Sequence, residues 1–298
     1  MNNIRRILGV NLLHNKGITG KNINVAILDT GMYLHNDLHN NLVTFEDIVN
    51  KRKESYDDNS HGTHISGILA GTGRQSNGLY CGIAPDAGII PIKVLNNNGT
   101  CDSENLFLGI QWILKNKDNY NIKIVNISIG TTSSSCDDEN SLLVRAVDSL
   151  WDCGLTVIAS AGNNGPGYKT ITTPGISRKI ITVGTNELMT HRQNDGSYKI
   201  TYSGKGPTHC NVPKPDIIAP GSHIVSCYYK NNGYISKSGT SMSTPIVSGA
   251  AALLLSYEPS LSNQNIKEIF CKTADDMGYD IYTQGCGRIN PYRALLSI

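Results

Sequence analysis

Three separate segments of this 298-residue chain hold an acid, a base and a nucleophile. Asp29 lies in Asp-Thr-Gly after an apolar run, His61 opens His-Gly-Thr-His, and Ser241 lies in Gly-Thr-Ser-Met-Ser before a long apolar stretch. A serine hydroxyl is a weak nucleophile until a base such as histidine removes its proton, and a carboxylate can orient that base. A serine at a helix start also directs its N–H and the helix dipole toward a developing oxyanion. Together the segments favour catalysis by a serine nucleophile.

Each segment alone has another interpretation. Asp-Thr-Gly also surrounds the catalytic aspartate of aspartic proteases, but that chemistry needs two carboxylates, and no second such motif occurs. His61 and His64 could bind zinc, but no glutamate stands between them as in the metalloprotease pattern. The serine segment could be only a capped helix start with an early proline. An esterase is disfavoured because the Gly-x-Ser-x-Gly elbow is absent around Ser241.

The elements that must position these residues alternate along the chain. Short runs rich in valine and isoleucine predict buried strands, and the segments between them have helical patterns. The predicted strands are 24–28, 89–95, 122–129, 155–161 and 180–183, and the predicted helices are 61–70, 103–117, 140–153, 243–256 and 262–273. This alternation predicts an α/β fold whose mostly parallel sheet is covered by helices on both faces. The segment 187–204 alternates around Asp195-Gly196 and predicts an antiparallel hairpin.

Polar residues follow several of the predicted strands. Asp29, Ser128, Gly130 and Asn163 all lie where a strand ends. In an open parallel sheet, ligands bind at the carboxyl ends of the strands. We therefore expect these residues to meet at one edge of the sheet.

Composition excludes several classes of protein. Hydrophobic residues make up 39% of the chain and charged residues 17%, which argues against disorder. The net charge of +2 is too small to suggest a nucleic-acid partner. The longest apolar run, 246–255, is far shorter than the roughly 20 residues that cross a bilayer, so no membrane partner is expected. Because residues 1–17 lack a secretory apolar region, we expect a cytoplasmic protein, or a secreted one if the chain is a trimmed mature form.

The eight cysteines are widely scattered, and no pair has the C-x-x-C spacing of a zinc or redox site. In a chain without a secretory signal, this pattern favours free thiols in a reducing compartment. The even number also allows disulfides, whose pairing the sequence does not determine.

The order of the three motifs, with the segments between them, resembles the subtilisin-like serine proteases, the subtilase family. The similarity runs from about Gly17 to Leu296 and includes Val25–Gly31, His61–His64, Gly82–Pro85, Ala161–Asn163, Pro215–Gly221 and Gly239–Pro245. It implies a single three-layer α/β domain over residues 1–298, with 1–16 as an N-terminal extension. The layout is most similar to intracellular bacterial subtilases without a propeptide.

The resemblance implies a role for each matching residue. Ser241 would be the nucleophile of a serine endopeptidase, His61 its general base and acid, and Asp29 the group that orients the imidazole. Asn163 would supply the oxyanion-hole amide. A dedicated leader-peptide processing protease and a catalytically silent pseudoprotease that binds a partner remain the alternatives, although all four residues are present.

The resemblance also implies a groove for a peptide or protein substrate in extended conformation. Its edges and first specificity pocket would be formed by Gly99, Thr100, Cys101, Ser128, Ile129, Gly130, Ser160, Ala161, Gly162, Asn164 and Thr172. Cys101 departs from relatives, which usually have glycine there. With Asn164 at the pocket rim and Thr172 near its base, we expect preference for Leu, Met or Gln over Lys, Arg and Trp. Relatives also place a cis proline at the site that matches Thr173-Pro174.

The chemistry of this family requires no cofactor, but a structural calcium ion is possible. Asp37 matches a frequent ligand position, and the loop that would supply the partner carbonyl groups is 71–80. Arg74 brings a like charge into this loop. Because calcium needs several oxygen ligands at once, Asp37 alone is a weak calcium candidate.

Overall fold

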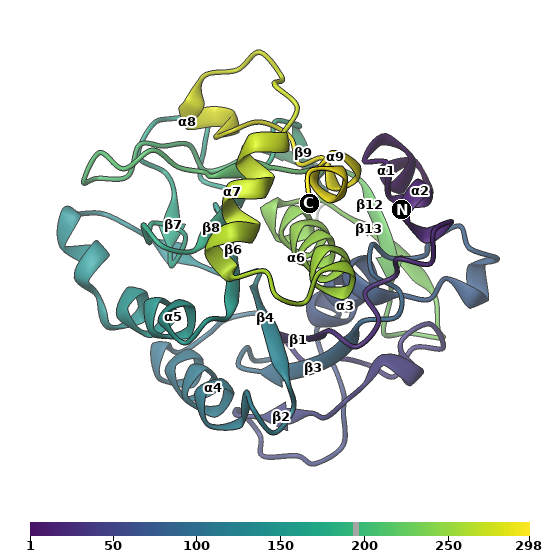
Figure 1. Ribbon diagram of the computed structural model, residues 1–298. Helices are drawn as coiled ribbons and strands as arrows, with labels where there is room; N and C mark the ends of the chain where they lie inside the picture. The colour runs from purple at the N-terminus through teal and green to yellow at the C-terminus, as the bar shows by residue number, and fades with distance from the viewer. Residues whose placement is uncertain (193–196) are drawn as a thin grey trace.

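A seven-stranded parallel sheet forms the centre of the computed structural model, which describes residues 1–192 and 197–298. Helices cover both faces of this sheet (Figure 1). Across the sheet, the strands are β11 (Ile217–Ile218), β8 (Ile181–Gly184), β6 (Thr156–Ser160), β4 (Ile122–Ile127), β1 (Asn24–Asp29), β3 (Gly88–Lys93) and β2 (Glu46–Asp47). The predicted α/β class is confirmed, and all five predicted strands are present.

Strand β1 lies inside the sheet, between β3 and β4. It pairs in parallel with both neighbours, for example Val25 with Ile89 and with Ile124. From Val25 to Asp29 every residue of the strand is buried, because helices cover both faces. The near-continuous apolar run before Asp29 is the consequence of this double burial.

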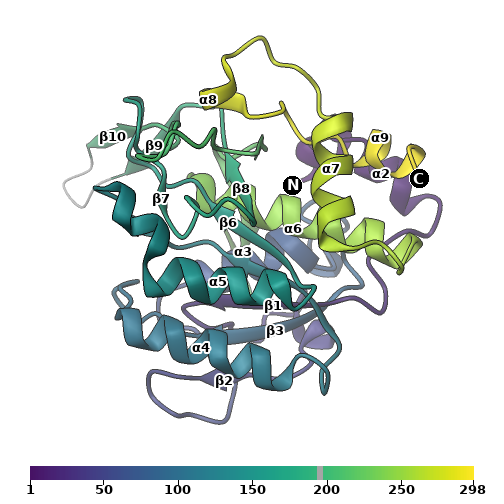
Figure 2. The same cartoon turned by 60° about the vertical axis from the view of Figure 1, so that its left-hand side comes forward.

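Two helices cover each face of the sheet. Helices α3 (His61–Ala70) and α6 (Thr240–Tyr257) pack on one face, and α4 (Ser103–Asn116) and α5 (Leu142–Asp152) on the other (Figures 1 and 2). From Met242 to Leu255 the residues of α6 are all buried, which explains a helix that is apolar on every side. Further along the chain, α7 (Asn263–Thr273) packs against β6 and α9 (Pro291–Leu296).

Three two-stranded antiparallel sheets lie outside the central sheet. The predicted hairpin is present as β9 (Met189–Arg192) and β10 (Tyr198–Thr201), although its turn at Asp195-Gly196 lies outside the described residues. The sequence analysis did not identify the other two sheets. They are β12 (Ile224–Cys227) with β13 (Tyr234–Lys237), and β5 (Thr131–Thr132) with β7 (Thr172–Thr173).

The N-terminal residues form two short helices, α1 (Asn2–Ile7) and α2 (Val10–His14). Ile4, Leu8 and Leu13 anchor them in the main hydrophobic core. Helix α2 lies beside α9, close to the C-terminus (Figures 1 and 2). The remaining short helices are η1 (His39–Asn41), η2 (Arg74–Ser76), η3 (Cys136–Asn140) and α8 (Ile281–Gln284). None of the described helices is long and apolar enough to cross a membrane.

The expectation that all eight cysteines are free is wrong for four of them. Cys136 is bonded to Cys210, and Cys271 to Cys286. The first pair is 74 residues apart in sequence, so its proximity arises only from the fold. The other four, at positions 81, 101, 153 and 227, are free. Because disulfides persist in oxidising surroundings, the cysteine pattern no longer favours a reducing compartment.

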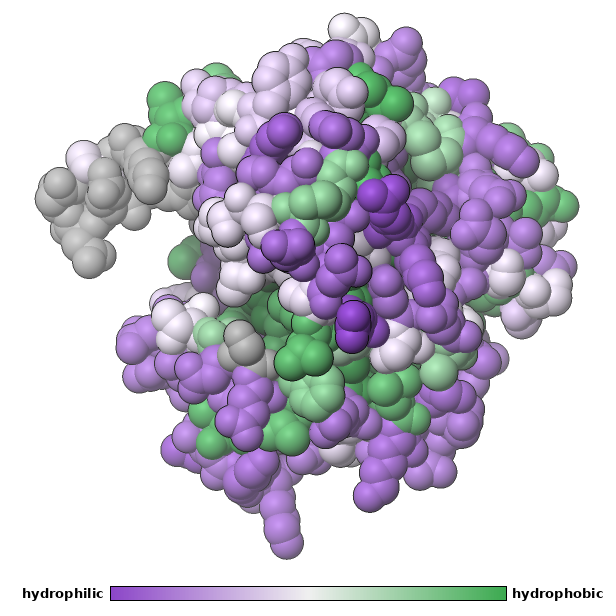
Figure 3. Space-filling view, turned by 90° about the vertical axis from the view of Figure 1, so that its left-hand side faces the viewer, coloured by the Kyte–Doolittle hydropathy of each residue, from purple (hydrophilic) through white to green (hydrophobic). Residues whose placement is uncertain are grey.

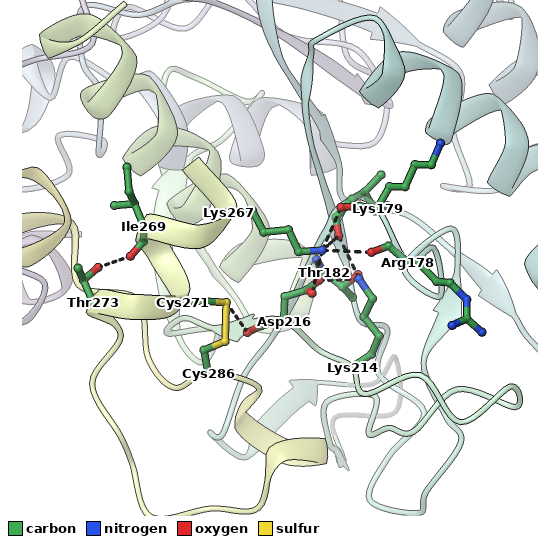
Figure 4. Close-up of a disulfide and its surroundings, with 11 residues drawn as sticks. Arg178, Lys179, Thr182, Lys214, Asp216, Lys267, Ile269, Cys271, Thr273 and Cys286 are labelled. Carbon is green, nitrogen blue, oxygen red and sulfur yellow. Dashed lines mark hydrogen bonds and ion pairs between the residues drawn. A yellow bond between two sulfur atoms is a disulfide. The ribbon is translucent and has the colours of Figure 1, made fainter. Parts of the chain in front are cut away.

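A buried ionic cluster lies beside the disulfide of α7 (Figure 4). Lys214 is fully buried, and its ammonium group lies 2.6 Å from Asp216 Oδ2 and 3.0 Å from Thr182 Oγ1. Lys267 of α7 lies 3.0 Å from the second oxygen of Asp216. Burial raises the pKa of Asp216, but the two lysines outweigh that effect and hold its pKa below the usual value. The cluster therefore fastens α7 to the edge of the sheet beside β8.

Candidate active site

The polar residues expected at one edge of the sheet do lie at the ends of their elements. Asp29 is the last residue of β1, Ser128 follows β4, and Asn163 lies shortly after β6. His61 is the first residue of α3, and Ser241 lies in the first turn of α6. Three strand ends and two helix starts thus meet around one cavity.

Asp29 and His61 are joined by short contacts. His61 Nδ1 lies 2.8 Å from Asp29 Oδ1 and 2.9 Å from Oδ2. The Asp29 side chain is 1% exposed, whereas that of His61 is 23% exposed. Asp29 Oδ1 also accepts the N–H of Thr30 at 2.8 Å. The carboxylate fixes the ring through Nδ1, so Nε2 is the nitrogen that remains for a reacting group.

The start of α3 is held by Asp57, a residue that the sequence analysis missed. Its Oδ1 accepts the N–H of Ser60 and the hydroxyl of Thr30, both at 2.9 Å. Its Oδ2 accepts the N–H of Thr63 at 2.9 Å. An aspartate just before a helix satisfies free N–H groups and the positive end of the dipole, and this was the available sequence signal. Asp57 thereby sets the position of His61.

Two lysines lie close to these carboxylates and were also missed. Lys93 is fully buried and donates to the Thr30 carbonyl oxygen at 2.8 Å and to Asp58 Oδ1 at 2.7 Å. Lys237 donates to Ser60 Oγ at 2.9 Å. Burial lowers the pKa of Lys237, and nearby carboxylates oppose that change. Both positions lie in apolar or mixed strands, where the pattern gives no sign that a cation is held inside.

Ser241 and Ser128 are linked by two hydrogen bonds. The Ser241 hydroxyl donates to the Ser128 carbonyl oxygen at 2.9 Å, and the Ser128 hydroxyl donates to the Ser241 carbonyl oxygen at 3.1 Å. Pro245 lacks the N–H that would otherwise bond this carbonyl of Ser241, so the oxygen is available to Ser128. In the described part of the chain, no hydrogen bond joins Ser241 Oγ to His61.

Asn163 is held through its oxygen atom. Asn163 Oδ1 accepts the N–H of Thr240 at 3.0 Å and the Thr240 hydroxyl at 3.1 Å. These bonds leave the amide nitrogen Nδ2 for another partner. The N–H of Ser241 has no acceptor among the described residues. Gly239, which precedes these residues, has a φ of 149°, a conformation that side chains disfavour.

A cavity of about 660 Å³ brings most of the predicted residues together. Apolar residues gather around a hollow on the side of the molecule that faces left in Figure 1 (Figure 3). Predicted residues that line the cavity are His61, Gly99, Thr100, Cys101, Ser128, Ile129, Gly130, Ser160, Gly162, Asn163, Asn164, Thr172 and Ser241. Ala161 does not line it, because its side chain packs in a small core with Ile171 and Ile176. No carboxylate is among the described residues that line this cavity.

Thr172 lies between Gly130 and Gly162, which also line this cavity. A methyl group added to Gly130 would lie 2.6 Å from Thr172 Oγ1, and one added to Gly162 would lie 2.7 Å from the same atom. The threonine side chain therefore fills the space between two glycine backbones. Thr172 is 5% exposed, and its hydroxyl has no partner among the described residues.

The predicted cis peptide bond between Thr173 and Pro174 is confirmed. It directly follows the strand that carries Thr172. Three further X-Pro bonds are also cis, at Pro166, Pro207 and Pro215, and none of these was predicted.

Gly130 and Cys101, which both line the cavity, expose backbone groups. The N–H and C=O of Gly130 and the N–H of Cys101 have no partner among the described residues. The Cys101 thiol donates to the Val94 carbonyl oxygen at 3.3 Å, so it is directed partly into the protein. Burial raises the pKa of Cys101 to about 11, which keeps this thiol protonated.

The residues around Asp37 do not fit a calcium ion. Its Oδ1 accepts the Gln75 N–H at 2.9 Å and the Thr72 hydroxyl at 3.3 Å, and its Oδ2 accepts the Tyr234 hydroxyl at 2.6 Å. Three donors from the protein therefore already share the two oxygens of this carboxylate, and Asp37 is the one carboxylate among these contacts, whereas calcium needs several oxygen ligands at once.

A second possible metal site adjoins the first. His35, Asp37 and Cys227 form the one cluster of three metal-type side chains found in the described part. His35 uses both ring nitrogens, since Nδ1 accepts the Asp37 N–H at 3.0 Å and Nε2 lies 3.1 Å from the Gly233 carbonyl oxygen. Burial raises the pKa of the Cys227 thiol, which keeps this thiol protonated. This cluster is therefore already satisfied by the protein.

The fold and the cavity together define a subtilisin-like α/β protein. The model of the subtilase family, Peptidase_S8, matches residues 20–288. The chain therefore belongs to the subtilase family.

Individual relatives agree with this assignment. The chain is 39% identical to Serine protease AprX of Bacillus subtilis (strain 168) over 293 residues, covering 92% of this chain and 66% of that protein. It is 34% identical to Subtilisin Savinase of Lederbergia lenta over 93% of this chain and 92% of that protein. The solved structure of Sphericase superimposes with a TM-score of 0.76 at 31% identity, covering 91% of this chain and 92% of that one. The chain thus spans slightly under two thirds of AprX.

Proposed function

We propose that this chain is a serine endopeptidase that hydrolyses peptide bonds through an acyl-enzyme on Ser241. The observation that carries the proposal is the convergence of Ser241, His61 and Asn163 on one cavity, with Asp29 bonded to the imidazole behind them. Membership of the subtilase family supports the same reaction class. In our proposal no cofactor takes part in the chemistry.

His61 acts as the general base and then as the general acid. The 2.8 Å contact between Nδ1 and Asp29 supports this role, because it keeps the proton on Nδ1 and leaves Nε2 able to accept another. Asp29 is almost fully buried, so its charge stabilises the imidazolium that forms when His61 takes the serine proton.

Ser241 must turn before it attacks. Its hydroxyl donates to the Ser128 carbonyl oxygen at 2.9 Å. Rotation about the Cα–Cβ bond releases this carbonyl and directs Oγ toward His61 Nε2. Catalytic hydrogen bonds are often absent or long in a free enzyme and form with substrate bound, so this geometry is compatible with the proposed role.

Two donors stabilise the negative oxygen of the tetrahedral intermediate. They are the Asn163 Nδ2 group and the N–H of Ser241 at the start of α6. The two bonds from Thr240 to Asn163 Oδ1 fix the amide so that Nδ2 is the free end. Fixed donors of this kind cost no reorganisation when charge develops, which is why they stabilise the transition state.

The substrate binds as an extended peptide between the two groove edges. The backbone groups of Gly130 and Cys101 that have no partner among residues 1–192 and 197–298 support this mode, because an added strand would bond to such groups. The side chain before the scissile bond enters the pocket that Thr172 closes. With no carboxylate among the described lining residues, a lysine or arginine there would have no ion pair.

Labelling with a fluorophosphonate probe tests the proposal. Wild type should be labelled on Ser241, and Ser241→Ala should not be labelled. A peptide-library cleavage profile of the unlabelled wild-type enzyme then separates a general endopeptidase from a processing protease with one narrow recognition sequence. A folded wild-type protein that neither takes up the probe nor cleaves any peptide would instead be a pseudoprotease.

A further inference from the structure

Arg5 of α1 is a buried cation without a carboxylate partner among the described residues. It is 6% exposed. Its Nη2 donates to the Gly78 carbonyl oxygen at 2.9 Å, and its Nη1 donates to the Cys81 carbonyl oxygen. Its Nε donates to Asn11 Oδ1 at 3.0 Å, and Asn2 Oδ1 lies 3.5 Å from Nη2. Burying a charge is costly, so these neutral oxygens must compensate it.

The groups that surround Arg5 are of the kind that bind hard metal cations. Backbone carbonyl and side-chain amide oxygens are typical calcium ligands. Gly78 and Cys81 belong to residues 71–82, the loop segment that follows α3. Here their carbonyl oxygens converge on a guanidinium group, whose N–H groups diverge in fixed directions and can reach several acceptors at once.

The same loop is held at two further points. On one side, its Gln75 N–H donates to Asp37 Oδ1 at 2.9 Å. On the other side, the Asn2 N–H of α1 donates to the Leu79 carbonyl oxygen at 3.0 Å. The loop carbonyl oxygens of Gly78, Leu79 and Cys81 and the Asp37 oxygen Oδ1 therefore all accept hydrogen bonds from donors of the protein.

We propose that Arg5 replaces a calcium ion as the cation that organises the loop 71–82. The loop keeps its conformation because α1 is docked beside it, and calcium has no part in this. The inference concerns stability and does not depend on the proposed catalytic activity.

Hydrogen exchange of the loop amides tests this proposal. Arg5→Met keeps a long apolar side chain but removes the guanidinium. Arg6→Met is the matched control, because Arg6 is exposed and, among the described residues, its guanidinium bonds only Asn3 Oδ1, at 2.8 Å. All proteins carry Ser241→Ala, which prevents self-digestion, and each is measured with calcium chloride and with EDTA.

We expect Arg5→Met to accelerate exchange in peptides covering 71–82 by about tenfold or more, while Arg6→Met leaves it unchanged. Exchange in the Arg5-containing protein should be the same with calcium and with EDTA. If Arg5→Met does not fold, Arg5→Lys replaces it. A lysine keeps the charge but cannot bond both loop carbonyls in the same way, so exchange should again rise, by a smaller factor.

Three results would overturn the proposal. Slower exchange of the loop in calcium than in EDTA, with Arg5 present, would mean that the ion binds there. Unchanged exchange in Arg5→Met would mean that the guanidinium does not organise the loop. An equal effect of Arg6→Met would mean that any lost charge on α1 loosens this region.

Discussion

Replacing Thr172 by glycine should widen the specificity pocket toward aromatic side chains. The substitution removes three non-hydrogen atoms that lie between the backbones of Gly130 and Gly162. A substrate phenylalanine that the Thr172 side chain excludes should then enter the pocket. We expect the ratio of kcat/KM for a Phe substrate to that for a Leu substrate to rise about 10- to 200-fold, because pocket fit is worth roughly 1–3 kcal/mol per methylene-sized group.

Two further substitutions separate the size of Thr172 from its polarity. Thr172→Val keeps the shape but removes the hydroxyl, which is buried and has no partner in the described part of the structure. It should lower kcat/KM for Gln relative to Leu while leaving the Phe to Leu ratio unchanged, if the hydroxyl bonds the substrate side chain. Thr172→Ser removes only the methyl group and should widen the pocket less than glycine does.

The assay compares peptides that differ only in the residue before the scissile bond. Competing substrates in one reaction, quantified by mass spectrometry, give the kcat/KM ratios directly. Thermal unfolding of each variant serves as the control, since glycine in β7 loses the buried threonine side chain as well as backbone rigidity and should cost about 1–3 kcal/mol. A Phe to Leu ratio that stays within about twofold of wild type in a folded Thr172→Gly protein would refute the assignment of this pocket.

Three other predictions concern the reacting groups and a buried histidine. Ser241→Ala, His61→Ala and Asp29→Ala should each remove most activity, and doubly substituted proteins should lose little more, because the three groups act as one unit; losses that multiply in the rates would contradict this. Asn163→Ala should lower kcat about 100- to 1,000-fold with a smaller change in KM, as steady-state kinetics can measure, and a change confined to KM would count against the oxyanion role. Burial, aided by the charge of Lys237, lowers the pKa of His64 to about 3 in the folded protein, compared with 6.5 in the unfolded chain. As the pH falls, the unfolded chain therefore takes up a proton on His64 at a higher pH than the folded protein does. Stability should therefore fall as the pH drops below 6.5, by about 2 kcal/mol at pH 5 from this group, and His64→Gln should lose that part of the dependence in urea unfolding.

The order of the elements followed from local sequence patterns. Residues 25–28 are apolar because β1 is buried on both faces, and residues 246–255 are almost entirely apolar because this part of α6 is buried on every side. Such patterns depend on neighbours in the chain, so they can be read without knowing the fold. The small sheet formed by β5 and β7 was missed because each of its strands has only two residues, and two residues show no periodicity.

The sequence by itself determined which residues could react and where along the elements they lie. The motifs that contain Asp29, His61, Asn163 and Ser241 indicate an acid, a base, an amide donor and a nucleophile from their residue types. The tertiary structure alone decided which distant groups satisfy one another. It paired Cys136 with Cys210, directed the Ser241 hydroxyl to Ser128, and set Arg5 against the carbonyls of Gly78 and Cys81. It also left the Thr172 hydroxyl with no partner in the part of the chain that the structure describes. These outcomes depend on distances between segments far apart in sequence, and such distances cannot be derived from local sequence patterns.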